Sequence, residues 1–190
     1  MSDLRFLALS GSLRAGSHNT GLLHALKAQA PTGVTVDVHQ GIGALPHFDQ
    51  DLEAHPPAAV VELRERVREA DGLLIATPEY NSAIPGVLVN ALDWLSRPPG
   101  DSVLRAKPTA ILGASPSQFG TARGQLVLRQ ILHRVQAPVV AHPEVTLFQS
   151  HRRFDAEGAF LGDDFTEGLL RELLDELVHL THRTHAHALR

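Results

Sequence analysis

A cluster of small polar residues around one arginine is the first segment whose composition suggests chemistry. It reads Ser10-Gly-Ser-Leu-Arg-Ala-Gly-Ser-His-Asn19 and stands between an apolar run and a helical pattern. Gly11 and Gly16 let a backbone approach a ligand closely, and Arg14 offers a fork of donors that matches phosphate oxygens. A helix that follows adds free N–H groups and the positive end of its dipole. The segment predicts a phosphate site, although a plain N-cap at Ser17 explains the same spacing.

Two further segments combine turn residues with groups that could contact a ligand. Residues 78–86 read Pro-Glu-Tyr-Asn-Ser-Ala-Ile-Pro-Gly, and the two prolines should fix the backbone N–H and C=O groups in place. Such a loop can bond the edge of a flat heteroaromatic ring through its main chain. Residues 113–120 read Gly-Ala-Ser-Pro-Ser-Gln-Phe-Gly, where Ser115 could reach the same ligand. Taken singly, each side chain has a simpler interpretation: Tyr80 packs at a rim, Glu79 is solvated and Ser115 shapes a turn.

Short apolar runs alternate with amphipathic stretches along the chain and must position these segments. Strands are predicted at residues 6–9, 34–38, 73–76, 109–112 and around Val139 or Val145. Apolar residues at helical spacing predict helices over 22–30, 60–70, 88–95, 126–135 and 165–180. Strands separated by helices favour an α/β fold with a parallel sheet and helices on both faces. Five strands suit the doubly wound order 2-1-3-4-5, which the sequence alone does not fix.

The three polar segments share one position in this arrangement. Each follows a predicted buried strand, and in a doubly wound sheet ligands bind beyond the carboxyl ends of the strands. Residues 10–19, 77–85 and 113–120 should therefore meet at one edge of the sheet. The irregular stretch at 40–57 is interpreted as a surface excursion, so residues 1–190 are expected to form a single domain.

The composition limits the classes of function. A net charge of −4 over 190 residues gives no basic footprint for nucleic acid or an anionic membrane. The absence of cysteine excludes thiolate nucleophiles and thiolate metal sites. Asp3 stands where a signal peptide needs basic residues, and the apolar stretch at 6–9 is too short to span a membrane. We therefore expect a cytoplasmic protein.

Histidines crowd the end of the chain, at positions 179, 182, 185 and 187. A helix would bring His179 and His182 together, which makes a metal site conceivable. Exposed histidines on a terminal helix are the simpler interpretation. No metal site is predicted.

Together the segments resemble the NAD(P)H-dependent FMN reductase family, which includes quinone, chromate and azo-dye reductases. The resemblance covers nearly the whole chain and rests on four blocks, Gly11–Arg14 with Ser17 and Asn19, Pro78–Asn81 with Ile84–Gly86, Asn90–Trp94, and Gly113–Pro116. It implies a flavodoxin-like three-layer sandwich holding one non-covalent FMN. It also implies NADPH or NADH as co-substrate and a small acceptor such as a quinone, azo compound, metal oxyanion or free flavin. Hydride transfer through FMN would follow ping-pong kinetics, and no side chain is assigned a catalytic role.

The resemblance carries over to named site residues. The FMN phosphate would be bound by Ser12, Arg14, Ser17 and Asn19. The isoalloxazine would be lined, mostly through backbone, by Pro78, Glu79, Tyr80 and Asn81. Ser115 would touch the flavin from the third segment, and His18 would lie at its rim. The helix at Asn90–Trp94 would support the site and a subunit contact, because a homodimer or homotetramer would wall off an otherwise open crevice.

Two departures from the family pattern bear on the acceptor. Ser82-Ala83 replaces a larger residue and a serine before Ile-Pro-Gly, and His18 replaces an aromatic or other apolar residue. Both bear on acceptor preference and nicotinamide fit rather than on flavin binding. Two other functions stay open at this point, an FMN electron carrier of the flavodoxin type and a flavin-free binding module. The mixed charges argue against the acidic docking face of a carrier.

Overall fold

Five parallel strands form the centre of the protein, which is described by a computed structural model for residues 3–188. The strand order is β2-β1-β3-β4-β5, so the predicted flavodoxin-like order is confirmed. The strands are β1 (Leu4–Ser10), β2 (Val34–His39), β3 (Gly72–Ala76), β4 (Thr109–Ala114) and β5 (Val145–Leu147). The α-helices are α1 (His18–Ala28), α2 (Ala58–Glu69), α3 (Gly86–Leu95), α4 (Ala122–Arg134) and α5 (Asp164–Ala188).

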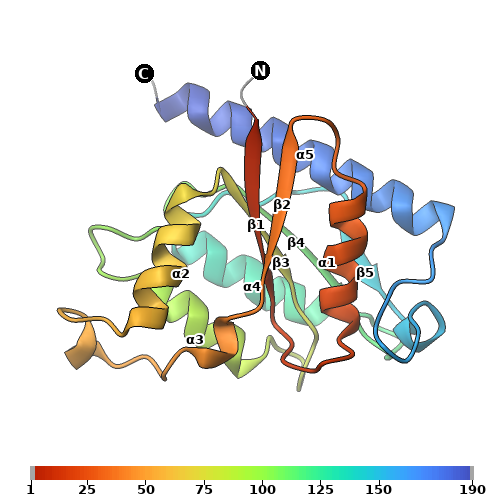
Figure 1. Ribbon diagram of the computed structural model, residues 1–190, viewed down its shortest axis with the longest axis horizontal. Coiled ribbons are helices and arrows are strands. Elements are labelled where there is room, and N and C mark those ends of the chain that lie inside the picture. The colour runs from red at the N-terminus through yellow and green to blue at the C-terminus, as the bar shows by residue number, and fades with distance from the viewer. Residues whose placement is uncertain (1–2, 189–190) are drawn as a thin grey trace.

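Helices cover both faces of the sheet because its central strands are apolar on both sides. In β1, Phe6 and Ala8 point to one core cluster, whereas Leu7 and Leu9 point to the other. The first cluster is closed by α1 and α5, and the second by α2, α3 and α4 (Figure 1). The three-layer arrangement follows from this alternation.

Some boundaries differ from the predicted ones. β5 is the strand at Val145, whereas Val139 makes only an isolated bridge to Thr109. α1 begins at His18, four residues before its apolar spacing starts, because a polar first turn is capped by Ser17. α5 runs beyond its predicted end to Ala188.

The excursion at 40–57 is fastened to α3. The Asn90 side chain accepts a hydrogen bond from the Phe48 N–H (2.7 Å) and donates one to the Pro46 carbonyl (2.9 Å). The buried Trp94 indole donates to the same carbonyl at 2.8 Å. The Asn90–Trp94 block therefore holds a long loop at the carboxyl edge.

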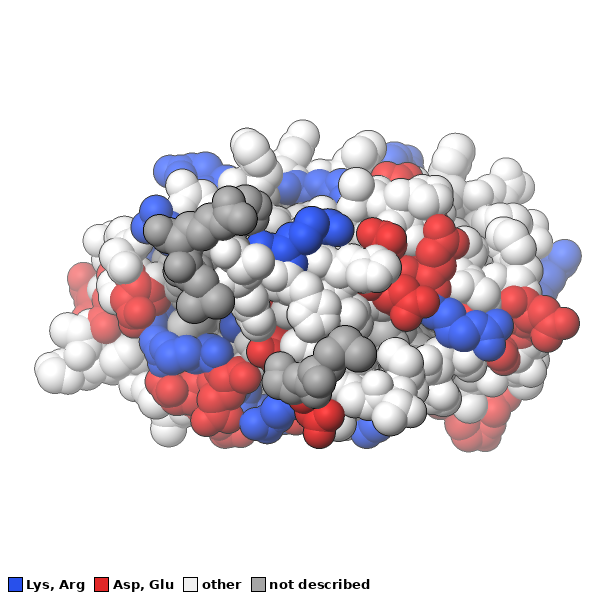
Figure 2. All heavy atoms as spheres, turned by 90° about the horizontal axis from the view of Figure 1, so that it is seen from above, with Lys and Arg blue, Asp and Glu red and all other residues white. Residues whose placement is uncertain are grey.

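The two edges of the sheet differ in character. The loops after β1, β3, β4 and β5 lie together at the lower edge of Figure 1, whereas α5 crosses the opposite edge. The face that carries both termini shows Lys and Arg interspersed with Asp and Glu (Figure 2). Among the described helices, none has the length and apolarity needed to cross a membrane.

The C-terminal histidines do not form a metal-binding cluster in the described part of α5. His179 is exposed and lies 3.5 Å from a Glu176 carboxylate oxygen. Within the described residues, no three His, Asp or Glu side chains come together in a way that could hold a metal ion. The side chain of His187 lies outside the described residues.

Candidate active site

The first loop, residues 11–17, joins the end of β1 to α1 and presents free donors. The Ser17 hydroxyl accepts a hydrogen bond from the Thr20 N–H (3.3 Å), so the N-cap interpretation is confirmed. Within the described residues, the N–H groups of His18 and Asn19 have no hydrogen-bond partner, as expected at a helix start. Arg14 is exposed and makes no ion pair with a described residue. A capped helix start with a free arginine beside it suits an anion.

Asn19 ties the first loop to the third. Its buried side-chain amide donates to the Ala114 carbonyl (2.9 Å) and accepts from the Ala114 N–H (3.0 Å). The amide is therefore engaged at the end of β4, and the backbone N–H of Asn19 is the group left for a phosphate. The sequence had suggested the side chain for that contact.

His18, in the same helical turn, contacts the segment that follows β5. Its Nδ1 lies 2.8 Å from the Ser150 hydroxyl, and its ring stacks on Phe154 with centroids 4.7 Å apart and planes 10° apart. The pKa of His18 is lowered by burial and then by the nearby charges of Arg14 and His151. His18 therefore anchors the first loop to the segment that follows β5.

That segment, residues 148–163, is called the strap. It packs so closely on α1 that a Cβ built at Gly21 would lie 1.9 Å from the Gly158 carbonyl oxygen. A Cβ at Gly16 would lie 3.0 Å from the Ala156 carbonyl oxygen. The strap could not be predicted from the sequence, because its contacts with Gly16 and Gly21 join residues far apart in the chain.

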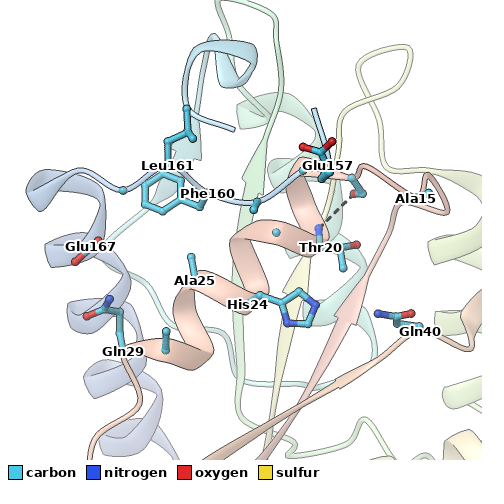
Figure 3. Close-up of a pocket in the computed structure, with 16 residues that line it drawn as sticks. Ala15, Thr20, His24, Ala25, Gln29, Gln40, Glu157, Phe160, Leu161 and Glu167 are labelled. Atoms are coloured by element: carbon cyan, nitrogen blue, oxygen red, sulfur yellow. Dashed lines mark hydrogen bonds between the residues drawn. The ribbon is translucent and has the colours of Figure 1, made fainter. Parts of the chain in front are cut away.

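A groove of about 700 Å³ runs along the outer side of α1 beneath the strap (Figure 3). His24, Glu157 and Glu167 line it, and it shares only Ala15 and Ser17 with the first loop. Because it contains two carboxylates and lies away from the second and third loops, we do not assign it to the FMN phosphate.

The second loop, residues 77–85, is held by a tight turn. Tyr80 and Ala83 exchange two backbone hydrogen bonds of 3.0 Å, and φ is positive at Asn81 (52°) and Ser82 (62°). Positive φ at both central residues is the pattern of a type I′ turn. Within the described residues, the N–H groups of Glu79, Asn81 and Ser82 have no partner and remain available to a ligand.

Glu79 corrects one interpretation made from the sequence. Its side chain is only 4% exposed, not solvated. The carboxylate accepts hydrogen bonds from Arg123 Nε (2.7 Å) and from the Gly124 N–H (3.0 Å) at the start of α4. It therefore caps α4 and fixes the second loop against the residues that follow the third.

The end of β4 and the third loop, residues 115–121, lie very close to the second loop. A Cβ at Gly113 would lie 2.3 Å from the Thr121 hydroxyl and 2.4 Å from the Thr77 carbonyl oxygen. The hydroxyl of the buried Ser115 accepts from the Ser117 N–H (3.2 Å), which is the turn role considered above. The Ser115 carbonyl accepts from the Ser150 N–H (3.1 Å), which ties this loop to the strap.

The geometry thus brings the three predicted loops together, and comparison with known proteins gives them a family. The model of the NADPH-dependent FMN reductase family matches residues 4–152. The chain belongs to this family. An NAD(P)H-dependent FMN reductase of Pseudomonas aeruginosa is 42% identical over 172 residues, covering 90% of this chain and 92% of the relative. A 2-hydroxy-1,4-benzoquinone reductase of a Burkholderia species is 40% identical over 173 residues, covering 91% of this chain and 93% of the relative.

A solved structure agrees with this assignment. FerB, a flavoenzyme NAD(P)H:acceptor oxidoreductase from Paracoccus denitrificans, matches with a TM-score of 0.85 at 33% identity, covering 95% of this chain and 98% of that one. The resemblance to FMN reductases and the flavodoxin-like fold are confirmed. As a member of the FMN reductase family, the protein is an oxidoreductase that uses FMN and NAD(P)H, which favours the enzyme over the carrier and the flavin-free module.

The described residues fit the FMN of this family. The first loop offers two free helix-start N–H groups and Arg14 to a phosphate. A Cβ at Gly11 would lie 3.3 Å from the buried Pro78, so the first and second loops touch. The free N–H groups of the second loop remain available to donate hydrogen bonds to the carbonyl oxygens of a ring edge.

Proposed function

We propose that this protein reduces quinones, and related small electron acceptors, with NADPH or NADH through one non-covalently bound FMN. The observation that carries the proposal is the single site formed by the three loops at the carboxyl edge of the sheet. The quinone preference is supported by the Burkholderia relative, whose name specifies a benzoquinone substrate.

We assign the contacts by loop. Arg14, Ser12, Ser17 and the start of α1 would bind the phosphate, and residues 78–81 would line the isoalloxazine through their backbone. Ser115 and His18 would border the flavin, the first from the third loop and the second from α1. Asn19 would act by holding the first and third loops together, as its two bonds to Ala114 indicate.

When bound, FMN would supply the hydride and electron transfer that couples oxidation of the nicotinamide to reduction of the acceptor. The protein's own share is to bind and orient. The helix start and Arg14 neutralise the phosphate, and the rigid second loop donates N–H groups to the ring edge. We assign no general acid or base. The residues assigned above, including Ser12 and Tyr80, act by binding the flavin.

We further propose that residues 1–190 work as one domain within a homodimer or homotetramer in the cytoplasm. Both core clusters lie on one sheet, which supports the single domain. Exposed apolar side chains border the carboxyl edge, which supports a subunit contact there: Leu13 is 63% exposed and Phe119 is 66% exposed. Cell fractionation would test the location.

The purified protein provides a direct test. It should be yellow, and NADPH or NADH should bleach the colour without air. A quinone should then restore the colour, and a steady-state panel of quinones, azo dyes, metal oxyanions and free flavin would rank the acceptors. A colourless protein that binds no added FMN would contradict the proposal, and so would a bound flavin that neither nicotinamide reduces.

A further inference from the structure

A second cavity lies on the other side of the strap, next to the third loop. It has a volume of about 530 Å³ and is lined by strap residues between Phe148 and Asp163. Two backbone hydrogen bonds connect its wall to the third loop, from Gln149 N–H to the Ser117 carbonyl (3.2 Å) and from Ser150 N–H to the Ser115 carbonyl (3.1 Å). The wall of the cavity is therefore bonded to the third loop, which carries Ser115 of the proposed flavin site.

The lining of this cavity combines an aromatic face with positive charge. Phe148 is 49% exposed, and the Arg153 guanidinium lies 5.9 Å from its ring centroid. Arg152 is exposed and forms no ion pair with a described residue. An exposed aromatic ring can stack on a base, and a free guanidinium matches phosphate oxygens.

The one carboxylate in the lining is neutralised. Asp163 accepts a hydrogen bond from Arg153 (2.8 Å) and others from Thr166. Burial alone would raise the pKa of Asp163, but the Thr166 bonds and the Arg153 charge lower it, so the group is ionised and paired. Arg153 is therefore committed to the scaffold, and Arg152 is the arginine that an incoming anion meets.

The groove along α1 differs in charge. It is lined by Glu157 and Glu167, and no arginine or lysine is among its lining residues. The strap thus separates a cavity that suits an anion from a groove that repels one. Gln149 lies in the wall of the cavity and has a left-handed backbone (φ 49°). Non-glycine residues with this conformation concentrate at ligand sites.

We propose that the cavity at Phe148 and Arg152 binds the adenosine end of the nicotinamide co-substrate, with Arg152 contacting the 2′-phosphate of NADPH. This inference rests on the proposed function, because a nicotinamide stacked at the flavin must leave the rest of its dinucleotide at the rim of the site. Phe148 stacks on the adenine of either nucleotide. Arg152 therefore determines the preference for NADPH over NADH.

The test compares Arg152→Ala with Arg105→Ala, an exposed arginine without an ion pair to a described residue that precedes β4 at the opposite edge. Adenosine 2′,5′-bisphosphate is titrated calorimetrically into each FMN-loaded variant, and flavin reduction is followed without air. Arg152→Ala should weaken the binding of the bisphosphate and of NADPH about tenfold and change the binding of NADH by no more than about twofold. The limiting rate of flavin reduction should be unchanged. Phe148→Ala should weaken the binding of both NADPH and NADH.

Two results would overturn the subsite. One is that Arg152→Ala binds the bisphosphate and NADPH as tightly as Arg105→Ala does. The other is an equal loss for NADH and NADPH, which would mean that Arg152 does not contact the 2′-phosphate. If neither nicotinamide reduced the bound flavin, the proposed function would fail, whereas the calorimetric comparison would still decide the subsite.

Discussion

Arg14 carries the phosphate assignment at the scale of single residues. Its guanidinium is exposed beside the start of α1 and makes no ion pair with a described residue. Arg14 breaks no ion pair when it turns toward a phosphate, whereas the Ser17 hydroxyl already accepts a hydrogen bond as the helix cap. The spacing of the first loop was therefore sufficient to predict a candidate anion contact.

Arg14→Ala should weaken FMN binding by about 1.5–3 kcal/mol, the usual contribution of a hydrogen bond to a charged group. Riboflavin has no phosphate, so its affinity should change little. Fluorescence titration of the flavin-free protein with both flavins measures the effect, with Arg105→Ala as the control. Equal affinity of the unmodified protein for FMN and riboflavin would contradict the phosphate assignment.

Other residue roles could not be predicted because they depend on pairs far apart in the sequence. Glu79 meets Arg123 44 positions later, Asn19 meets Ala114 95 positions later, and His18 meets Ser150 132 positions later. Local spacing records helix faces and turns, but not which distant backbone group a side chain reaches.

His39 should make the stability of the flavin-free protein sensitive to acid. It is buried at the end of β2 with Nδ1 2.6 Å from an Arg66 nitrogen. Burial and the Arg66 charge lower its pKa below the usual 6.5, against the weaker opposite effects of Glu62 and Asp37. Below about pH 6.5 the unfolded chain therefore binds a proton that the folded chain resists, so stability falls as the pH falls.

Urea denaturation of the flavin-free protein between about pH 7 and pH 5.5 tests this. His39→Asn should lose less stability over that range than the unmodified protein. His55→Asn, which changes an exposed histidine of the excursion, should behave like the unmodified protein. An unchanged pH dependence in His39→Asn would show that other groups cause the acid sensitivity.

At the scale of elements, the order and type of the strands and helices were predictable, but the strap was not. Continuous apolar runs mark β1, β3 and β4 because their side chains face helices on both sides, and apolar alternation marks the edge strand β2. The strap contains no such pattern, and its packing on α1 depends on Gly21 and Gly158, where any side chain would collide with backbone. In the amino-acid sequence, such a close contact between two backbones is marked only by a glycine.

Gly21→Ala should therefore destabilise the protein by about 1–3 kcal/mol, the range for overpacked sites, and weaken FMN retention by displacing the strap. The new Cβ would lie 1.9 Å from the Gly158 carbonyl oxygen. Gly168→Ala is the matched control, because nothing lies within 4 Å of its added Cβ in α5. It should stabilise the helix by about 0.5–1 kcal/mol. Similar denaturation midpoints for the two variants would refute the interlocked contact.

At the scale of the whole molecule, the carboxyl edge exposes more apolar surface than a closed site needs. Leu13, Tyr80 and Phe119 all project from loops that follow different strands. We expect a homo-oligomer, at least a dimer, in which a second subunit covers part of this edge. Light scattering at micromolar concentration tests this, and a stable monomer with full activity would refute it.

The last prediction concerns kinetics and depends on how open this edge is. In the second loop Ser82 is exposed and Ala83 is half-buried, and both are small, so nicotinamide and acceptor should stack in the same place over the flavin. The oxidised nicotinamide must then leave before the acceptor enters, which gives ping-pong kinetics and parallel initial-rate lines at several acceptor concentrations. Because the chain contains no cysteine, thiol alkylation should leave the rate unchanged. Intersecting lines would mean that both substrates bind at once.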